Sequence, residues 1–192
     1  MQTPFFSLLV LTLATVQVSP AQQFVSPSER SALEGSSYTH YPLGRASARV
    51  QTLHDHIPGG TWIAAHAYRR DAVAIRGNVA GLSCELQVTL SMAPHTAASA
   101  SPSFAANVGS HAVVVLPRQI ISIPATARPG MDPAPIFEVV VPYMVPFQVP
   151  PQGGTLCVDV EVFGNLTNAG ADQNASLYMD CLLYTSPSPR DR

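Results

Sequence analysis

The sequence contains no lysine, and charge of either sign is scarce, because charged residues make up only 11 % of its 192 residues. All ten basic residues are arginines, and with twelve acidic residues the formal net charge is −2. A nucleic-acid-binding protein normally has a basic excess, so we expect no nucleic-acid partner. A disordered charged segment is also excluded, because hydrophobic residues account for 46 % of the chain. The composition therefore predicts a folded domain with an apolar core.

Long apolar runs are few. Residues 5–16 (FFSLLVLTLATV) form an apolar run that is too short to cross a bilayer, and the small residues Ser19 and Ala21 follow it. This pattern is typical of a secretory signal peptide, although no basic residue precedes the run. We therefore expect residues 1–21 to be removed and the protein to be secreted, periplasmic or on the cell surface. No later stretch reaches 18 apolar residues, so no membrane span is expected in the mature chain.

The C-terminal residues 181–192 (CLLYTSPSPRDR) resemble a translated sequencing adapter, of the kind found in open reading frames from fragmented environmental DNA assemblies. This resemblance implies that the gene was cut near Asp180, so that its natural C-terminus is missing and residues 181–192 form a non-native tail. The segment left for folding, residues 22–180, has the length of one domain. We expect that domain to be incomplete at its C-terminus.

Two segments alternate apolar and polar residues with a period of two, as strands with one buried face require. The clearer one is residues 82–92 (LSCELQVTLSM), and its expected inward residues are Leu82, Cys84, Leu86, Val88, Leu90 and Met92. In the second, Thr155–Phe163, the inward residues would be Leu156, Val158, Val160 and Val162. Cys157, Asp159 and Glu161 would then point outward.

Further segments have strand composition, and turn signals such as Pro58-Gly59-Gly60 separate them. These candidate strands are Thr61–Tyr68, Asp71–Ile75, Ala112–Leu116, Gln119–Ile123 and Ile136–Val141. No amphipathic helix of ten residues is evident, and only a short helix at Ser28–Leu33 is suggested. The fold class predicted is all-β, an antiparallel β-sandwich or jelly roll.

Two irregular segments stand out. Val-Pro steps recur at Pro142, Pro146 and Pro150, and because proline cannot donate to a strand ladder, we expect an edge strand or a crossing between sheets. A polyproline docking ligand is the less favoured alternative. Residues 93–107 (APHTAASASPSFAAN) form a low-complexity loop with either a mobile surface role or a recognition role.

The best metal candidate is His54-Asp55-His56. On an extended segment the two imidazoles would share a face and could bind Zn²⁺, with His66 or His40 as third ligand. No HExxH or CxxC motif supports the site, so solvated loop histidines are the favoured interpretation. Ca²⁺ is the other candidate ion, since Asp159 and Glu161 offer oxygen ligands, but no Asp-rich loop accompanies them. The sequence therefore predicts no cofactor.

Cys84 and Cys157 are the cysteines that remain once the tail is set aside, and export would allow them to form a disulfide. The alternation places Cys84 on an apolar face and Cys157 on a polar face. A disulfide between sheets needs both side chains to point inward, so pairing would require a bulge in one strand. The sequence leaves the bonded and free states equally open.

Aromatic residues could form a sugar-binding platform, for which Trp62 and Tyr68 are the candidates, although most aromatics are expected in the core. Catalysis is less favoured. No G-x-S-x-G motif is present, and Asp159 and Glu161, which could act as a glycosidase pair, are expected to be solvated.

Residues 33–71 carry a family resemblance, in the residues Glu34, Gly35, Pro42, Gly44, Arg45, Arg49, Gln51, His54, Arg69 and Arg70. The segment is similar to the opening of a group of uncharacterised exported all-β proteins of environmental bacteria. The resemblance implies secretion and an all-β fold, and it supplies no catalytic residue. We therefore expect a non-catalytic surface or binding protein, whose partner would be an extracellular glycan or a cell-surface component. The alternatives are an extracellular metal-dependent or glycan-active hydrolase, and a structural matrix or appendage subunit.

Overall fold

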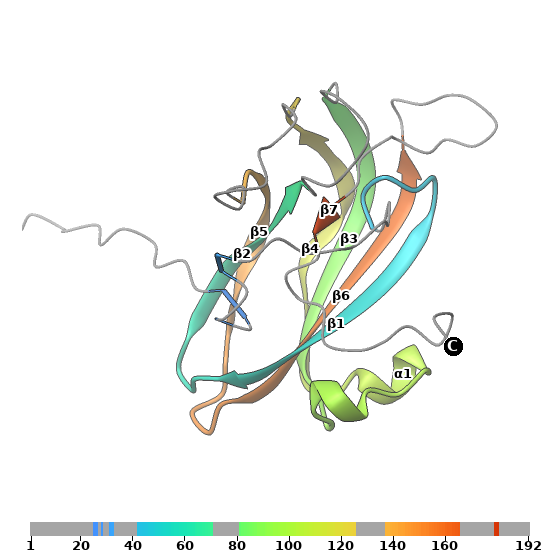
Figure 1. Ribbon diagram of the computed structural model, residues 1–192. Coiled ribbons are helices and arrows are strands. Elements are labelled where there is room, and N and C mark those ends of the chain that lie inside the picture. The colour runs from blue at the N-terminus through green and yellow to red at the C-terminus, as the bar shows by residue number, and fades with distance from the viewer. Residues whose placement is uncertain are drawn as a thin grey trace, which may run out of the picture.

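The computed structural model describes residues 25, 26, 28, 31, 32, 42–70, 81–125, 137–165 and 179–180. In these residues the chain is all-β, as predicted, and its strands form two antiparallel sheets (Figure 1). The short helical elements are η2 (Ala97–Ser99) and α1 (Phe104–Asn107), and Ser28 is also in a 3-10 conformation. Residues 1–21, the tail 181–192, the candidate strand Asp71–Ile75 and half of the candidate helix Ser28–Leu33 lie outside the described residues. No helix in the described ranges is long and apolar enough to cross a membrane.

The first sheet has the strand order β1-β6-β3-β4 and the second has the order β5-β2-β7. The first sheet contains β1 (Ala48–Ile57), β6 (Gly154–Asn165), β3 (Leu82–Met92) and β4 (Ser110–Ile123). The second contains β5 (Val139–Gln148), β2 (Trp62–Arg70) and β7 (Met179–Asp180). β4 joins the two candidate strands Ala112–Leu116 and Gln119–Ile123 into one strand that runs through Pro117.

The centre of the first sheet follows from the period-two pattern. All six expected inward residues of β3 are buried, and so are Leu156, Val158, Val160 and Val162 of β6. The register places Val88 opposite Val160 and Leu90 opposite Val158, so aliphatic side chains meet on one face of the paired strands. This burial of apolar surface favours the observed pairing.

The main apolar core takes side chains from both sheets. Ile63 of β2 and Val141 and Phe147 of β5 belong to the same buried cluster as the inward residues of β3 and β6. Each sheet therefore turns one face to a common core, and the opposite face of the four-stranded sheet carries its polar side chains.

The chain passes from one sheet to the other at a corner formed by two turns, residues 58–61 and 149–153. Gly60 N donates to Val149 O at 3.0 Å, and Val149 N donates to Thr61 O at 2.8 Å. Glycine is required at Gly59, because a Cβ there would lie 1.9 Å from Pro151 O. The chain therefore crosses between the sheets twice at this corner, once from β1 to β2 and once from β5 to β6.

β5 is an edge strand, as its prolines predicted. Ile63 lies opposite Phe147, whereas Ala65 lies opposite Pro142, so the pairing is irregular at residues 143–146 of β5. Met144 and Val145 in this bulge are exposed, whereas the Tyr143 hydroxyl reaches His66.

Candidate functional site

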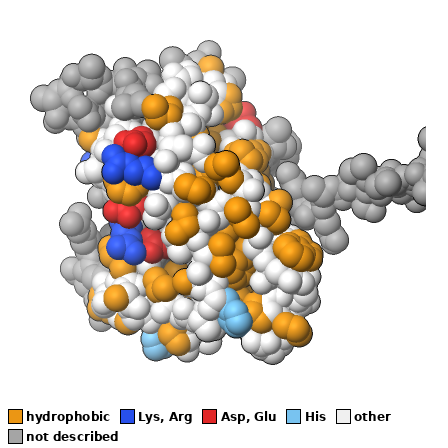
Figure 2. All heavy atoms as spheres, turned by 180° about the vertical axis from the view of Figure 1, so that it is seen from behind, with side chains coloured by type: hydrophobic (Ala, Val, Ile, Leu, Met, Phe, Trp, Pro, Cys, Tyr) orange, Lys and Arg blue, Asp and Glu red, His pale blue; other side chains and the backbone are white. Residues whose placement is uncertain are grey.

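The polar groups of the molecule gather on the outer face of the four-stranded sheet. In the β1–β6 register, Arg49 lies opposite Glu161 and Gln51 lies opposite Asp159. Both pairs alternate with inward aliphatic residues of β6, so their side chains project away from the core. Figure 2 shows positive and negative side chains alternating in a column on one side of the molecule.

Arg49 and Asp159 form a bidentate ion pair on this face. Arg49 Nε donates to Asp159 Oδ1 at 3.0 Å, and Arg49 Nη2 donates to Oδ2 at 2.7 Å. Gln51 Nε2 donates a third hydrogen bond to Oδ2 at 2.8 Å. The hydrogen bonds to Asp159 raise the pKa of Arg49. Asp159 is only 7 % exposed, so it is buried by its partners and not solvated as the sequence had suggested.

The low-complexity loop, residues 93–107, is fixed over the part of this face that carries Arg49 and Gln51. Asn107 Nδ2 donates to Gln51 Oε1 at 3.1 Å and to Ser101 O at 2.9 Å, while Asn107 Oδ1 accepts from Ser101 N at 2.8 Å. Gln51 Nε2 also donates to Phe104 O at 3.2 Å, and the Arg49 guanidinium lies 4.9 Å from the centre of the Phe104 ring. Residues 101–107 are therefore tied to the same network as Arg49.

Asp55 anchors the other part of this loop. Its carboxylate accepts hydrogen bonds from Ala97 N at 3.0 and 3.1 Å and from Thr155 Oγ1 at 2.7 Å. Beneath the loop, Ala97 packs with Leu53 and Cys157 in a small second core. The loop is thus a structured part of the outer face.

A second arginine repeats the arrangement on the other side of β6. Arg118 of β4 donates from Nε and Nη2 to the two carboxylate oxygens of Glu85 on β3, at 2.8 and 2.9 Å. Its guanidinium lies 4.1 Å from the centre of the Phe163 ring. Hydrogen bonding to Arg118 lowers the pKa of Glu85. Each arginine therefore combines a bidentate carboxylate with an aromatic ring.

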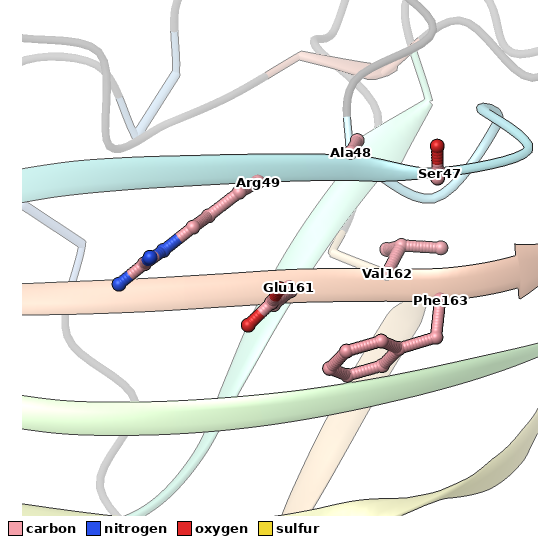
Figure 3. Close-up of a pocket in the computed structure, with 6 residues that line it drawn as sticks. All are labelled: Ser47, Ala48, Arg49, Glu161, Val162 and Phe163. Atoms are coloured by element: carbon pink, nitrogen blue, oxygen red, sulfur yellow. The ribbon is translucent and has the colours of Figure 1, made fainter.

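Glu161 lies between these two arginine clusters. Within the described strands and loops, no side chain hydrogen-bonds to its carboxylate, although its charge helps to raise the pKa of both Arg49 and Arg118. Glu161 borders an open hollow of about 340 Å³ whose lining residues are Ser47, Ala48, Arg49, Glu161, Val162 and Phe163 (Figure 3). The hollow therefore combines a carboxylate that has kept its acceptor capacity with a guanidinium and an aromatic ring.

The three candidate metal-binding histidines do not form a site. His54 is buried on the inner face, opposite Leu156, whereas His56 is exposed. His56 has a φ of 61° and falls at a register shift between His54 and Ile57, which breaks the alternation that would have placed both imidazoles on one face. The prediction of a shared face was therefore wrong.

His66 has no ring nitrogen left for a metal. Its Nδ1 lies 2.9 Å from the Tyr143 hydroxyl and its Nε2 lies 3.1 Å from the Tyr68 hydroxyl. Burial lowers the pKa of His66 to about 3, and it lowers the pKa of His54 to about 4. Across the described ranges, no group of three or more His, Cys, Asp or Glu side chains could hold a metal ion. His40 lies outside the described residues.

Cys84 and Cys157 are free thiols in the structure. Cys84 lies in the main core opposite Asn165, whereas Cys157 lies in the small second core opposite Ser91. The two side chains are on opposite faces of the first sheet and far apart along it, so the candidate disulfide is not formed. Burial raises the pKa of each thiol to about 12.

The two candidate sugar-binding aromatics also separate. Trp62 is 61 % exposed at the start of β2, whereas Tyr68 is 4 % exposed and belongs to the core. Tyr68 therefore cannot stack on a ligand at the surface.

The residues that do surround the hollow include Arg49, which sequence reasoning named only within a resemblance. Arg118 was not singled out at all.

No protein family, curated protein or solved structure matches this chain. The resemblance of residues 33–71 to exported bacterial proteins stays a prediction. We therefore infer a function from the geometry of the outer face.

Proposed function

We propose that this chain is an exported β-sandwich protein that binds a glycan, without altering it chemically, at the hollow beside Glu161. The observation that carries the proposal is the placement of the Glu161 carboxylate between two stacked and ion-paired arginines. The signal-peptide pattern of residues 1–21 supports export, and the core shared by two antiparallel sheets supports the sandwich.

Arg49, Glu161 and Arg118 form a row whose hydrogen-bonding groups suit sugar hydroxyls. Arg49 and Arg118 each use Nε and Nη2 on their own carboxylate, which leaves the Nη1 group as a donor. Glu161, between them, is an acceptor. A sugar hydroxyl both donates and accepts, so neighbouring hydroxyls can satisfy a donor–acceptor–donor row.

The arginines are also held in place before any ligand arrives. Each guanidinium is fixed by two hydrogen bonds and an aromatic contact, so less side-chain entropy is lost on binding. The hollow of about 340 Å³ lies at the lower end of ligand-site volumes. A short glycan segment lying across an open surface fits this shape better than a fully enclosed small molecule.

Binding is favoured over glycan hydrolysis by the state of the carboxylates. A glycosidase needs one carboxylic acid whose pKa is raised, so that it can protonate the leaving group. Here Arg118 lowers the pKa of Glu85, and Arg49 binds both oxygens of Asp159. The ion pair with Arg118 favours the ionised form of Glu85, which can accept hydrogen bonds but cannot supply a proton.

The test is a glycan array followed by calorimetry on the mature chain. Wild type should bind at least one neutral glycan, and Glu161→Gln should weaken that binding by about tenfold or more, since a hydrogen bond to a charged group contributes about 1.5–3 kcal/mol. Glu138→Gln is the matched control, because Glu138 is also partly buried and does not line the hollow. Absence of glycan binding, or equal affinity in all three proteins, would contradict the proposal.

A further inference from the structure

The charges around the hollow do not balance. Arg49 is paired with Asp159, and Arg118 is paired with Glu85, so each of these two ion pairs is neutral as a unit. Glu161 adds a third carboxylate to the same face of the sheet. The five side chains therefore carry one negative charge in excess, and that charge belongs to Glu161.

The neighbours of Glu161 in the sheet do not supply a cation for its carboxylate. On one side it lies opposite Arg49, whose Nε and Nη2 both donate to Asp159. On the other side it lies opposite Gln87 of β3, which is neutral. Both arginines respond to the charge of Glu161, since it helps to raise their pKa values, but neither of them hydrogen-bonds to it. A ligand can therefore supply the missing cation.

The Glu161 carboxylate is also accessible to such a ligand. Glu161 is only partly buried, and Figure 3 shows its carboxylate between the Arg49 side chain and the Phe163 ring. Residues 101–107, which are tied to the same face, contain no charged side chain. An ammonium group is small and has three donors, so it can bond to Glu161 and still reach a neighbouring acceptor such as the Gln87 amide oxygen.

We propose that the preferred ligand of this site is an amino sugar with a free ammonium group, which binds the Glu161 carboxylate. The inference rests on the glycan binding proposed above and names the class of glycan. A protonated amine balances the charge of the face, and its hydrogen bond to a carboxylate is stronger than that of a neutral hydroxyl. A carboxylated or sulfated glycan would meet the excess negative charge and is disfavoured.

The test compares three trisaccharides that share one β-linked backbone and differ only at the second carbon of each sugar: the trimers of glucosamine, N-acetylglucosamine and glucose. Calorimetry on the mature chain measures their dissociation constants at about pH 6, where an amine of this kind is protonated. Wild type should bind the glucosamine trimer about tenfold more tightly than either neutral trimer, because only the ammonium forms a charge-assisted hydrogen bond.

Substitutions of Glu161 separate the effect of charge from that of shape. Glu161→Gln should abolish the preference for the glucosamine trimer, whereas Glu161→Asp keeps the charge and should keep the preference. Glu138→Gln is the matched control, because it removes the same charge from the chain at a position that does not line the hollow. It should retain the wild-type preference, which separates binding at Glu161 from general attraction of a cationic sugar to an acidic protein. Circular dichroism checks that each variant is folded.

The outcomes separate this inference from the proposed function. The inference is overturned by a wild type that binds the three trimers equally or binds none of them, by a preference that survives in Glu161→Gln, or by one that is lost in Glu138→Gln. Binding of a neutral glycan without any preference for the glucosamine trimer refutes the inference alone. A wild type that binds no glycan at all refutes the proposed function as well.

Discussion

Arg49 and Asp159 meet through two parallel hydrogen bonds across neighbouring strands, although 110 positions separate them in the sequence. The pair is asymmetric in exposure, since the Arg49 side chain is 41 % exposed and the Asp159 side chain only 7 % exposed. Arg49 therefore presents its charge to solvent while Asp159 holds it in place from below. This asymmetry determines what each substitution should do.

Asp159→Asn should destabilise the fold by about 1–3 kcal/mol, because it removes a buried, charge-assisted partner of Arg49 and Gln51. Urea unfolding followed by circular dichroism measures the change. Glu161→Gln is the control, and it should leave the midpoint near that of wild type, since no described side chain depends on Glu161 for a hydrogen bond. Equal midpoints for all three proteins would contradict this account of the pair.

Stability should fall as pH falls below 6.5, because His54 and His66 are buried in the neutral form. Their pKa values, lowered to about 4 and about 3 by burial, lie below the ordinary value of 6.5, so the unfolded chain takes up protons first. Each histidine should cost up to about 1.4 kcal/mol per pH unit in this range. Urea unfolding between about pH 5 and pH 7 isolates this effect, since carboxylates are still mostly ionised there.

The variant His66→Gln serves as the control for the acid effect. It removes one of the two titrating groups, so its stability should depend on pH less steeply than that of wild type. Identical slopes for the two proteins between about pH 5 and pH 7 would show that His66 does not remain neutral in the folded state.

Both thiols should resist modification in the folded state. Cys84 and Cys157 are completely buried, and a pKa of about 12 leaves almost no thiolate at neutral pH. In a Cys181→Ser background, an aromatic disulfide reagent should react slowly with the native protein and with two thiols after denaturation. A mass lower by two hydrogens after expression in an oxidising compartment would instead indicate a disulfide.

Gly59→Ala should destabilise the corner by about 1–3 kcal/mol, because the new Cβ would overlap Pro151 O. Gly60 supplies the comparison. Its φ is +78° but no atom lies within 4 Å of a Cβ built there, so Gly60→Ala should cost only about 1 kcal/mol. Thermal unfolding of both variants measures the difference, and the reverse order of stabilities would contradict the close approach of the two turns.

The sequence predicted which side chains point into the core better than it predicted which strands pair with each other. The alternation of residues 82–92 correctly assigned every inward side chain, because burial of one face requires a period of two. The pairing of Arg49 with Asp159 could not be derived, since it depends on a register between strands from opposite ends of the domain. For the same reason, the sequence offered Asp159 as a solvated acid.

Local irregularities caused the other errors. The histidine pair would share a face on a regular strand, but the positive φ of His56 rotates it away from His54. Nothing in the triplet His54-Asp55-His56 signals this shift, because it occurs where β1 bends into the corner. The sequence predicted Ala112–Leu116 and Gln119–Ile123 as separate strands, yet an edge strand tolerates a proline, and β4 continues through Pro117.

The hydrogen bonds between Gly60, Thr61 and Val149 also bear on the order of folding events. The first of these two turns emerges from the ribosome early, but its partner turn is made only after β5 has been synthesised. Closure of a corner between such distant segments has a high entropic barrier. The corner between β1 and β2 can therefore form only after the second half of the chain has been synthesised. We expect this corner to close late and to limit the rate at which the whole domain folds.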